Sequence, residues 1–445
     1  MATSRNPSAG ATGARWVAWL CWAAVALEGF DLVVLGTVTP TLLDYEAWGL
    51  TPGEVGVISS WGLVGVMIGA LCIGTVTDLV GRRRTMLLSV VWFSVFTALL
   101  AAAPAPWAFG TLRFLAGLGL GGVLPTALAL VSEYVPSERS SASITFTMTG
   151  YHVGGVLTAV LAIPLLDVIG WRGMFLIGAV PALFLVPLML RKLPESPTFL
   201  LTAGRREEAE ELAGRYGIPL AATPPVREDG SRDKLAALRT LFTGRYLPAT
   251  IAFWVASFMG LLLVYGLNQW LPQIMRQAGY ELGAAITFLL VLNVGAVIGL
   301  LFAGRVADRF GSKPANAAWF ALASVFLFLL SAKLPLPVTY LVVLLAGVFV
   351  FSGQVLVYAY VGRYYPAGSR ATAIGWASGI GRIGAITGPL VGGFLVGNDL
   401  AVPWGFYAFA ITGVIALVAV SLVPRSPAET DAAPAPARRP GAASA

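Results

Sequence analysis

Charged side chains are scarce in this chain of 445 residues, because Asp, Glu, Lys and Arg together make up only 11% of it. Soluble domains hold about 25% charged residues, so the composition excludes an ordinary soluble protein. Hydrophobic residues account for 57% of the sequence. Their runs are much longer than the ~10-residue alternating segments of a membrane barrel. The sequence therefore predicts an all-α membrane protein.

Cysteine and histidine are nearly absent, with two residues of the first kind and one of the second. Cys21 and Cys72 fall in separate apolar runs, so no disulfide framework is expected. One histidine with two distant cysteines is too few for a metal cluster, and we expect no metal and no other cofactor. No nucleophile–base pair or phosphate-binding loop is recognisable, so we do not expect an enzyme.

Long apolar runs are what the sequence has in abundance. A transmembrane helix needs about 20 apolar residues to cross ~30 Å of hydrocarbon. By that length we expect twelve transmembrane helices, at residues 16–41, 55–77, 85–103, 107–132, 142–166, 173–191, 247–271, 283–304, 314–332, 338–361, 371–396 and 402–423.

Positive charge is distributed unevenly along the chain, whose net charge is +7. Most Arg and Lys residues fall in loops on the same side of the predicted bilayer as the N-terminus, such as Arg82–Arg84 and the polar segment 192–246. Basic residues favour the cytoplasmic side, so both termini are expected there. The excess of basic residues therefore indicates how the chain is oriented in the membrane. We expect the lipid bilayer as a partner and no nucleic acid.

Segments that recur 230 positions apart divide the chain into two similar halves. Gly74–Gly81 matches Gly304–Gly311, Glu133–Pro136 matches Arg363–Pro366, and Pro194–Pro197 matches Pro424–Pro427. Parallel repeats are a known plan of secondary transporters. We expect a cytoplasmic N-terminal tail (1–15), two six-helix halves (16–191 and 247–423), a cytoplasmic central loop (192–246) with a surface helix at Thr202–Tyr216, and a disordered cytoplasmic tail (424–445).

Two carboxylates interrupt the first apolar run. Glu28 and Asp31 are spaced i,i+3 and therefore share a face of the predicted helix. From Arg15 to Asp44 this helix would be ~43 Å long, and its midpoint falls between the two acids. A carboxylate at that depth is costly unless it faces a polar cavity, pairs with a cation or takes up a proton. Both acids are candidates for proton coupling, with Asp31 the first of the two.

Basic groups are predicted at a similar depth. The same count places His152 and Arg382 near the midpoints of their helices, and the two positions are equivalent in the repeat. Arg113 lies closer to the outer end of its helix. Each of the three is a candidate for binding an anionic substrate, and each has a structural alternative. Arg113 could pair permanently with Asp31, His152 could be a hydrogen-bonded core residue, and Arg382 could have a permanent carboxylate partner instead of binding an anion bidentately.

Polar and aromatic residues supply the rest of a predicted cavity. Binding pockets are lined mostly by apolar and aromatic side chains, with a few polar groups that orient the ligand. The further substrate-binding candidates are Tyr265, Gln269, Gln354, Tyr358 and Trp376. The alternative for the aromatic residues is anchoring at headgroup depth.

Several motifs resemble those of one transporter family. The loop Gly74-x-x-x-Asp78-x-x-Gly81-Arg82-Arg83 and the helix segment Arg113-x-x-x-Gly117-x-Gly119 resemble motifs of the major facilitator superfamily. The segments Glu28-Gly-Phe-Asp31, Gly266–Pro272 and Tyr365–Pro389 are similar to its aromatic acid:H⁺ symporter family.

The resemblance implies a major facilitator fold of twelve transmembrane helices. It also implies a symporter of the bacterial inner membrane that uses the proton gradient to import a small aromatic carboxylate such as a benzoate or hydroxybenzoate. Gating roles are implied for Gly74, Asp78, Gly81, Arg82 and Arg83, and for Asp308 in the second copy, with topology alone as the other reading of the arginines. Import of nicotinate, shikimate or a sugar-like solute, drug export, and a receptor without turnover stay open as alternatives. We expect a monomer.

Overall fold

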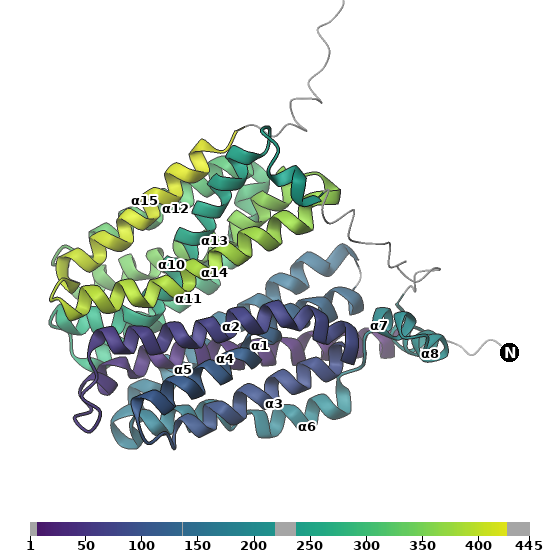
Figure 1. The fold of residues 1–445 in the computed structure, drawn as a ribbon, viewed down its shortest axis with the longest axis horizontal. Coiled ribbons are helices and arrows are strands. Elements are labelled where there is room, and N and C mark those ends of the chain that lie inside the picture. Colours follow the sequence, from purple (N-terminus) through teal and green to yellow (C-terminus); the bar gives the residue numbers. More distant parts are fainter. Residues whose placement is uncertain (1–6, 136, 219–236, 425–445) are drawn as a thin grey trace, which may run out of the picture.

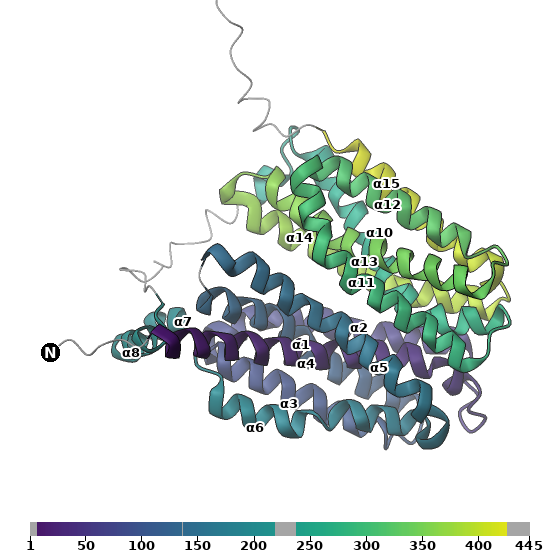
Figure 2. The same ribbon diagram turned by 180° about the vertical axis from the view of Figure 1, so that it is seen from behind.

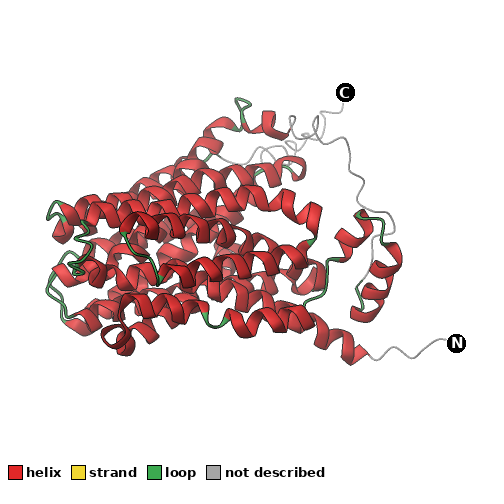
Figure 3. Cartoon of the chain, turned by 60° about the horizontal axis from the view of Figure 1, so that its bottom comes forward, coloured by secondary structure: helices red, strands yellow, loops and turns green. Residues whose placement is uncertain are grey.

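The computed structural model describes residues 7–135, 137–218 and 237–424, and helices are the regular structure of these residues (Figure 3). The first half contains α1 (Pro7–Leu43), α2 (Pro52–Val80), α3 (Arg82–Leu100), α4 (Pro106–Tyr134), α5 (Ser137–Ala179) and α6 (Ala182–Lys192). Two short helices follow, α7 (Pro197–Thr202) and α8 (Arg206–Tyr216). The second half contains α10 (Leu247–Gln277), α11 (Leu282–Phe310), α12 (Ser312–Leu329), α13 (Leu336–Tyr364), α14 (Ala367–Gly397), the π-helical turn η1 (Ala401–Gly405) and α15 (Phe406–Leu422).

Ten stretches of the described residues are helical, long and apolar enough to cross a membrane. One of them, Ala142–Lys192, has 51 residues, about twice the length that a single crossing needs. Gly170 breaks it with φ 66° and ψ 178°, so it provides two crossings. The 18-residue helix α12, which packs against α13 and α15, is the remaining one. The structure therefore agrees with the twelve predicted helices.

The predicted surface helix at Thr202–Tyr216 is shorter in the structure. Helix α8 begins only at Arg206, because Gly204 adopts φ +77° and separates it from α7. Three i,i+3 or i,i+4 ion pairs line α8 and its N-cap, as expected for a solvated helix. The tail predicted from residue 424 onward lies outside the described residues after Pro424.

Local sequence explains where several long helices begin and end. At the start of α2, the Thr51 hydroxyl accepts from the backbone N–H of Glu54, and the Glu54 carboxylate accepts from the backbone N–H of Thr51 at 2.8 Å. This is a capping box. At its other end Gly81 takes φ +96°, and its counterpart Gly311 after α11 takes φ +93°. Both conformations favour glycine, which accounts for the glycine of the loop motif in each half.

The repeat seen in the sequence also governs helix packing. A Cβ atom on Gly65 of α2 would lie 2.2 Å from the carbonyl oxygen of Phe114 in α4, and one on Gly295 of α11 would lie 2.2 Å from that of Leu344 in α13. In the second pair, the glycine and the residue that supplies the carbonyl each lie 230 positions after their counterparts in the first pair. Two more equivalent pairs of close contacts follow this rule, Gly69–Leu118 with Gly299–Val348 and Gly117–Gly62 with Gly347–Leu292.

The two halves form two bundles, α1–α6 and α10–α15, that touch at one end and diverge toward the end that carries the N-terminus and α8 (Figures 1 and 2). They meet through α2 with α14, α5 with α11, and α1 with α10. Gln269 donates to the Thr39 hydroxyl at 2.7 Å. These two residues are equivalent in the repeat, so their contact marks the axis that relates the halves.

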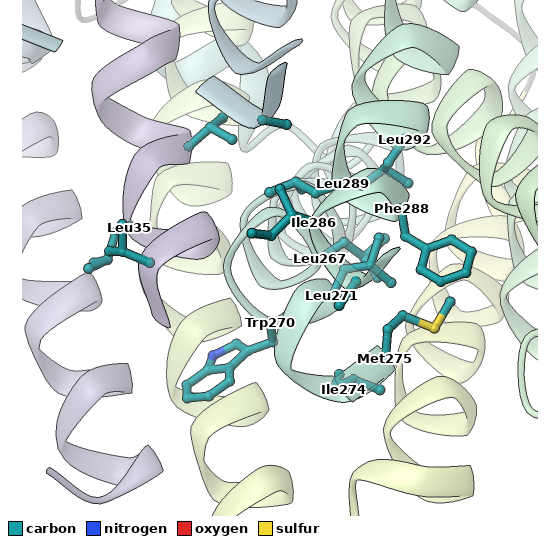
Figure 4. Packing of buried hydrophobic residues seen from close by; sticks show 14 of the residues in the cluster. Leu35, Leu267, Trp270, Leu271, Ile274, Met275, Ile286, Phe288, Leu289 and Leu292 are labelled. Atoms are coloured by element: carbon teal, nitrogen blue, oxygen red, sulfur yellow. The ribbon is translucent and has the colours of Figure 1, made fainter. Parts of the chain in front are cut away.

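Contacts between the halves gather on the outer side of the bundle. Ser60 donates to the carbonyl of Ile386 at 2.7 Å, and Arg276 forms an ion pair with Asp44 at 2.6 Å. Beside them the apolar core is dense: Figure 4 shows Leu267 and Leu271 of α10 close to Ile286 and Leu289 of α11. The ion pairs among the described cytoplasmic helix ends stay within one half. The contacts that join the halves are therefore concentrated away from the end that carries the N-terminus and α8 (Figures 1 and 2).

The close α2–α4 and α11–α13 contacts generate a stability prediction. We expect Gly65→Ala and Gly295→Ala each to lower the melting temperature of the purified protein, because a methyl group cannot fit against the facing carbonyl. Gly375→Ala is the matched control, since nothing lies within 4 Å of its Cβ position. It should raise the melting temperature or leave it unchanged, because Ala favours a helix over Gly by about 1 kcal/mol. Equal behaviour of all three variants would contradict the packing described here.

Candidate functional site

A close crossing of α1 and α5 brings Glu28 to mid-depth beside Tyr151. A Cβ atom on Gly29 would lie 2.0 Å from the carbonyl oxygen of Tyr151, so only glycine allows this approach. Glu28 is 5% exposed, and its Oε2 atom has no hydrogen-bond partner. A buried carboxylate oxygen without a partner is costly. Glu28 is therefore poised to gain a proton or a partner during function.

The equivalent crossing of α10 and α14 brings Arg382 to the same level from the other half. A Cβ atom on Gly384 would lie 2.0 Å from the carbonyl oxygen of Phe258, and Phe258 is the repeat equivalent of Glu28. Arg382 is half-buried, and among the described residues its guanidinium has no ion pair and no hydrogen bond. It lies close enough to Glu28 for their charges to interact. Among the described residues, a cation and a carboxylate without ion-pair partners thus lie near each other, one from each half.

Three tyrosines lie near Arg382, and two of them also lie near Glu28. The Tyr151 and Tyr265 hydroxyls adjoin each other, and each interacts with the charge of Arg382. Tyr358 adjoins Gln354 on its own helix and Ser378 on α14, and it also interacts with Arg382. The rings of all three are half-buried. The arrangement offers a cationic anchor for an anion and flat side chains beside it.

Asp31 and Arg113 form a separate ion pair inside the first half. The guanidinium lies 2.7 Å from the Asp31 carboxylate and 3.2 Å from its backbone oxygen, and the side chains are 2% and 4% exposed. The Thr97 hydroxyl donates to the other carboxylate oxygen. Asp31 is thus fully engaged, unlike Glu28, which is only one helical turn away.

His152 adjoins the site through Tyr151. Its Nδ1 atom lies 3.4 Å from Oδ1 of Asn293 on α11. Its ring packs edge-on against Tyr151, with ring centroids 5.0 Å apart, and against Phe351, with centroids 4.9 Å apart. It therefore lies in an aromatic slot between the two halves.

Two predicted substrate-binding residues lie elsewhere. Gln269 bonds to Thr39 and Ser59 in the closed outer contact. Trp376 is 41% exposed and stacks on Trp254, with ring centroids 5.5 Å apart. Two residues along a helix is a rotation of about 200°, so Trp376 faces away from Ser378 and from the adjoining Arg382. The structure does not bring either residue to the tyrosine cluster.

The loop motifs of the two halves differ in how their charges pair. In the first half Arg82 pairs with Glu133 at 3.1 Å, and Asp78 is exposed with no ion pair among the described residues. In the second half Arg363, the repeat equivalent of Glu133, bonds instead to Asp308. The charge at this one position therefore determines whether the arginine or the aspartate of the loop motif forms the ion pair.

Hydrogen bonds to the Pro194–Pro197 segment and to the end of α6 hold the first loop motif in place. The Glu195 carboxylate accepts from the backbone N–H of Arg83 at 2.9 Å, and the Arg83 side chain donates to the carbonyl of Leu190 at 2.5 Å. In the second half Lys313 donates to the carbonyl of Val423 at 2.6 Å. Gly74 contacts nothing within 4 Å of its Cβ position, so packing does not explain that glycine.

Sequence reasoning missed three polar residues that the structure places at or beside the site. Tyr151 is adjacent to His152, but tyrosine is common at membrane interfaces and gave no depth signal. Asn293 and Thr97 bind His152 and Asp31 from other helices. A buried asparagine in the middle of an apolar span is costly, and Asn293 could have been found on that ground.

Fold and site together define a secondary transport protein with a charged site between two six-helix halves, and comparisons with known proteins agree. The Major Facilitator Superfamily profile matches residues 21–331 and 291–444. Among solved structures, the inward-open xylose transporter XylE from Escherichia coli superposes with a TM-score of 0.72 at 17% identity, over 92% of this chain and 95% of that one.

Three curated bacterial relatives align over most of their length. A gentisate transporter of Corynebacterium glutamicum is 38% identical, covering 94% of this chain and 89% of the relative. A gallate transporter of Pseudomonas putida is 35% identical, covering 90% of each chain. A benzoate transport protein of Acinetobacter baylyi is 34% identical, covering 90% and 87%. The chain belongs to the Major Facilitator Superfamily, within its aromatic acid:H⁺ symporter family, and is a multi-pass membrane protein.

The two buried arginines differ in their partners, and this generates a prediction. Removing one member of a buried ion pair costs about 3–5 kcal/mol, so Asp31→Asn and Arg113→Leu should each lower the melting temperature sharply. The double variant Asp31→Asn/Arg113→Leu should recover part of the loss, because no charge is left unpaired.

Arg382→Gln is the matched control, since Arg382 has no ion pair to break. It should keep the melting temperature of the unaltered protein. If Arg382→Gln lowers the melting temperature and Arg113→Leu does not, Arg382 and not Arg113 is the arginine that stabilises the fold.

Proposed function

We propose that this protein imports a small aromatic carboxylate together with a proton, by alternating access. The observation that carries the proposal is the guanidinium of Arg382, which is unpaired at mid-depth among three tyrosines and faces an unpaired buried carboxylate. A guanidinium binds a carboxylate bidentately. Tyrosine rings offer aromatic faces and edges to a flat substrate. The names of the relatives, which refer to gentisate, gallate and benzoate, support the same class of substrate.

Charge balance explains how a proton would be coupled to the substrate. In the empty site the negative charge of Glu28 offsets the positive charge of Arg382. A substrate carboxylate bound to Arg382 would add a second negative charge, and two such charges 4 Å apart repel by roughly 4 kcal/mol at an effective dielectric of 20. Protonation of Glu28 removes this repulsion. One proton would therefore accompany each monovalent anion.

Asp31 takes a supporting role in this proposal. Its hydrogen bonds to Arg113 and Thr97 hold it in place, and its charge acts on Glu28 one turn away. A nearby negative charge favours the protonated form of a carboxyl group. The Asp31–Arg113 pair is thus a fixed structural element that also biases Glu28. This reverses the order in which the sequence alone ranked the two acids.

Alternating access would follow from rocking of the halves, residues 16–191 and 247–423, about the site between them. The outer contacts around Thr39 and Gln269, including Arg276–Asp44, would break when the site opens to the outside. The motif residues Gly74, Asp78 and Arg82 of the first half would then meet the second half at the cytoplasmic side. Every site residue comes from one chain, so a monomer suffices as the transport unit. Three tyrosines around the anchor favour an aromatic acid over shikimate or a sugar-like solute.

Coupling through Glu28 is tested by Glu28→Gln, which mimics the protonated acid permanently. In proteoliposomes we expect this variant to lose accumulation of 4-hydroxybenzoate driven by a pH gradient, because no proton can accompany the anion. It should retain counterflow exchange of the same acid. The control is Glu54→Gln on the exposed start of α2, where glutamine preserves the capping box. If Glu28→Gln still accumulates substrate like the control, Glu28 is not the coupling group.

Anchoring by Arg382 is tested by Arg382→Lys and Arg382→Gln. In Arg382→Gln the substrate carboxylate would lose its charged, bidentate partner. We therefore expect KM for uptake to rise by about 100-fold or more. Arg382→Lys should recover only part of the affinity, because lysine lacks the planar fork. Unchanged KM in Arg382→Gln would mean that the carboxylate binds elsewhere.

A further inference from the structure

We infer that His152 recognises a hydroxyl group on the substrate ring, so that the protein prefers ring-hydroxylated aromatic acids over unsubstituted benzoate. This inference rests on the proposed function and concerns the same site. Three observations carry it: the orientation of the imidazole, the aromatic slot around it, and its position relative to Arg382.

Hydrogen bonds around Asn293 determine which ring nitrogen of His152 is free. The Nδ2 group of Asn293 donates to Oδ1 of Asn268 at 3.0 Å and to the carbonyl of Leu289 at 3.1 Å. Both of its N–H groups are therefore used by acceptors, and Oδ1 must be the atom that faces His152. Oδ1 can only accept, so Nδ1 of His152 carries a proton. In the neutral ring Nε2 is then an acceptor.

The free acceptor has no partner among the described residues. No hydrogen bond joins Nε2 to any described residue, and no carboxylate contacts the ring. The neighbours of the imidazole are the rings of Tyr151 and Phe351, and His152 is otherwise buried. An acceptor in such a slot favours a ligand that brings its own donor on a flat ring. A phenolic hydroxyl is that kind of donor.

The position of His152 relative to Arg382 fits an aromatic acid. The two residues are equivalent in the repeat, so they reach mid-depth from opposite halves. Tyr151 adjoins both, because its ring packs against His152 and its hydroxyl interacts with Arg382. A substrate whose carboxylate binds Arg382 would lie along Tyr151 and direct its far edge to His152. One half would then bind the charge and the other half the ring substituent.

A core histidine that serves packing alone is the competing account of the same contacts. It predicts that changes at His152 affect all substrates equally. Recognition of a hydroxyl predicts a selective effect, because a polar partner left unpaired discriminates strongly between analogues. Substrate pairs that differ only in the hydroxyl therefore separate the two accounts.

The experiment measures uptake of benzoate, 3-hydroxybenzoate, 4-hydroxybenzoate and 4-methoxybenzoate in proteoliposomes with an inward proton gradient. We expect kcat/KM of the unaltered protein to be about tenfold or more higher for at least one hydroxybenzoate than for benzoate. The methoxy compound, which has no O–H donor, should gain nothing over benzoate. His152→Leu should lose the preference, because kcat/KM falls much further for the favoured hydroxybenzoate than for benzoate. His152→Gln should keep part of it, because its amide oxygen can accept.

The outcomes separate this inference from the proposal beneath it. Equal uptake of benzoate and both hydroxybenzoates by the unaltered protein overturns the inference alone, and so does an equal loss for all substrates in His152→Leu. If the methoxy compound matches the hydroxybenzoates, the O–H donor is irrelevant and the inference also fails. Absence of gradient-driven uptake of any aromatic acid by the unaltered protein overturns the proposed function together with it. If His152→Leu does not fold, the methoxy comparison still decides.

Discussion

The site is organised around a guanidinium that has no permanent partner at mid-depth of a membrane protein. Such a group is expensive to leave uncompensated, and the fold compensates it incompletely, with a facing carboxylate and three phenols but no ion pair. In the proposed function, this incomplete compensation would make anion binding favourable and reversible. A fully paired Arg382 would be as inert toward substrate as Arg113, whose carboxylate partner is 2.7 Å away. The proposal thus gives the structural role to Arg113 and the substrate-binding role to Arg382.

Duplication explains how one chain builds such an unequal site. Both halves use close crossings of equivalent helices, because the repeat-related glycines Gly154 and Gly384 lie against the carbonyl oxygens of Ala26 in α1 and Phe258 in α10. The backbone therefore brings equivalent positions of the two halves to similar places. The side chains at those positions have diverged. Glu28 corresponds to Phe258, and His152 corresponds to Arg382. Glycine packing against carbonyl oxygens needs no particular side chain from its partner, which leaves these positions free to specialise.

Position along each helix could be predicted from the sequence, but the partners of each side chain could not. Counting helix length located Glu28, Asp31, His152 and Arg382 near the midplane, and the repeat made the last two equivalent. The direction of each side chain depends on how neighbouring helices cross, which no count along one helix contains. Glu28 and Asp31 share a broad helix face, yet Asp31 meets α3 and α4 within its own half while Glu28 faces the other half. The same reason explains Trp376, which lies at a suitable height along α14 but faces away from the tyrosine cluster.

The most direct test of the account is a structure of the protein with bound 4-hydroxybenzoate, determined by cryo-electron microscopy in lipid nanodiscs. The account predicts density for a flat ring beside Tyr151 and Tyr265, with the carboxylate within hydrogen-bond distance of the Arg382 guanidinium and the Asp31–Arg113 pair intact. A carboxylate bound to Arg113, with Asp31 displaced, would contradict it.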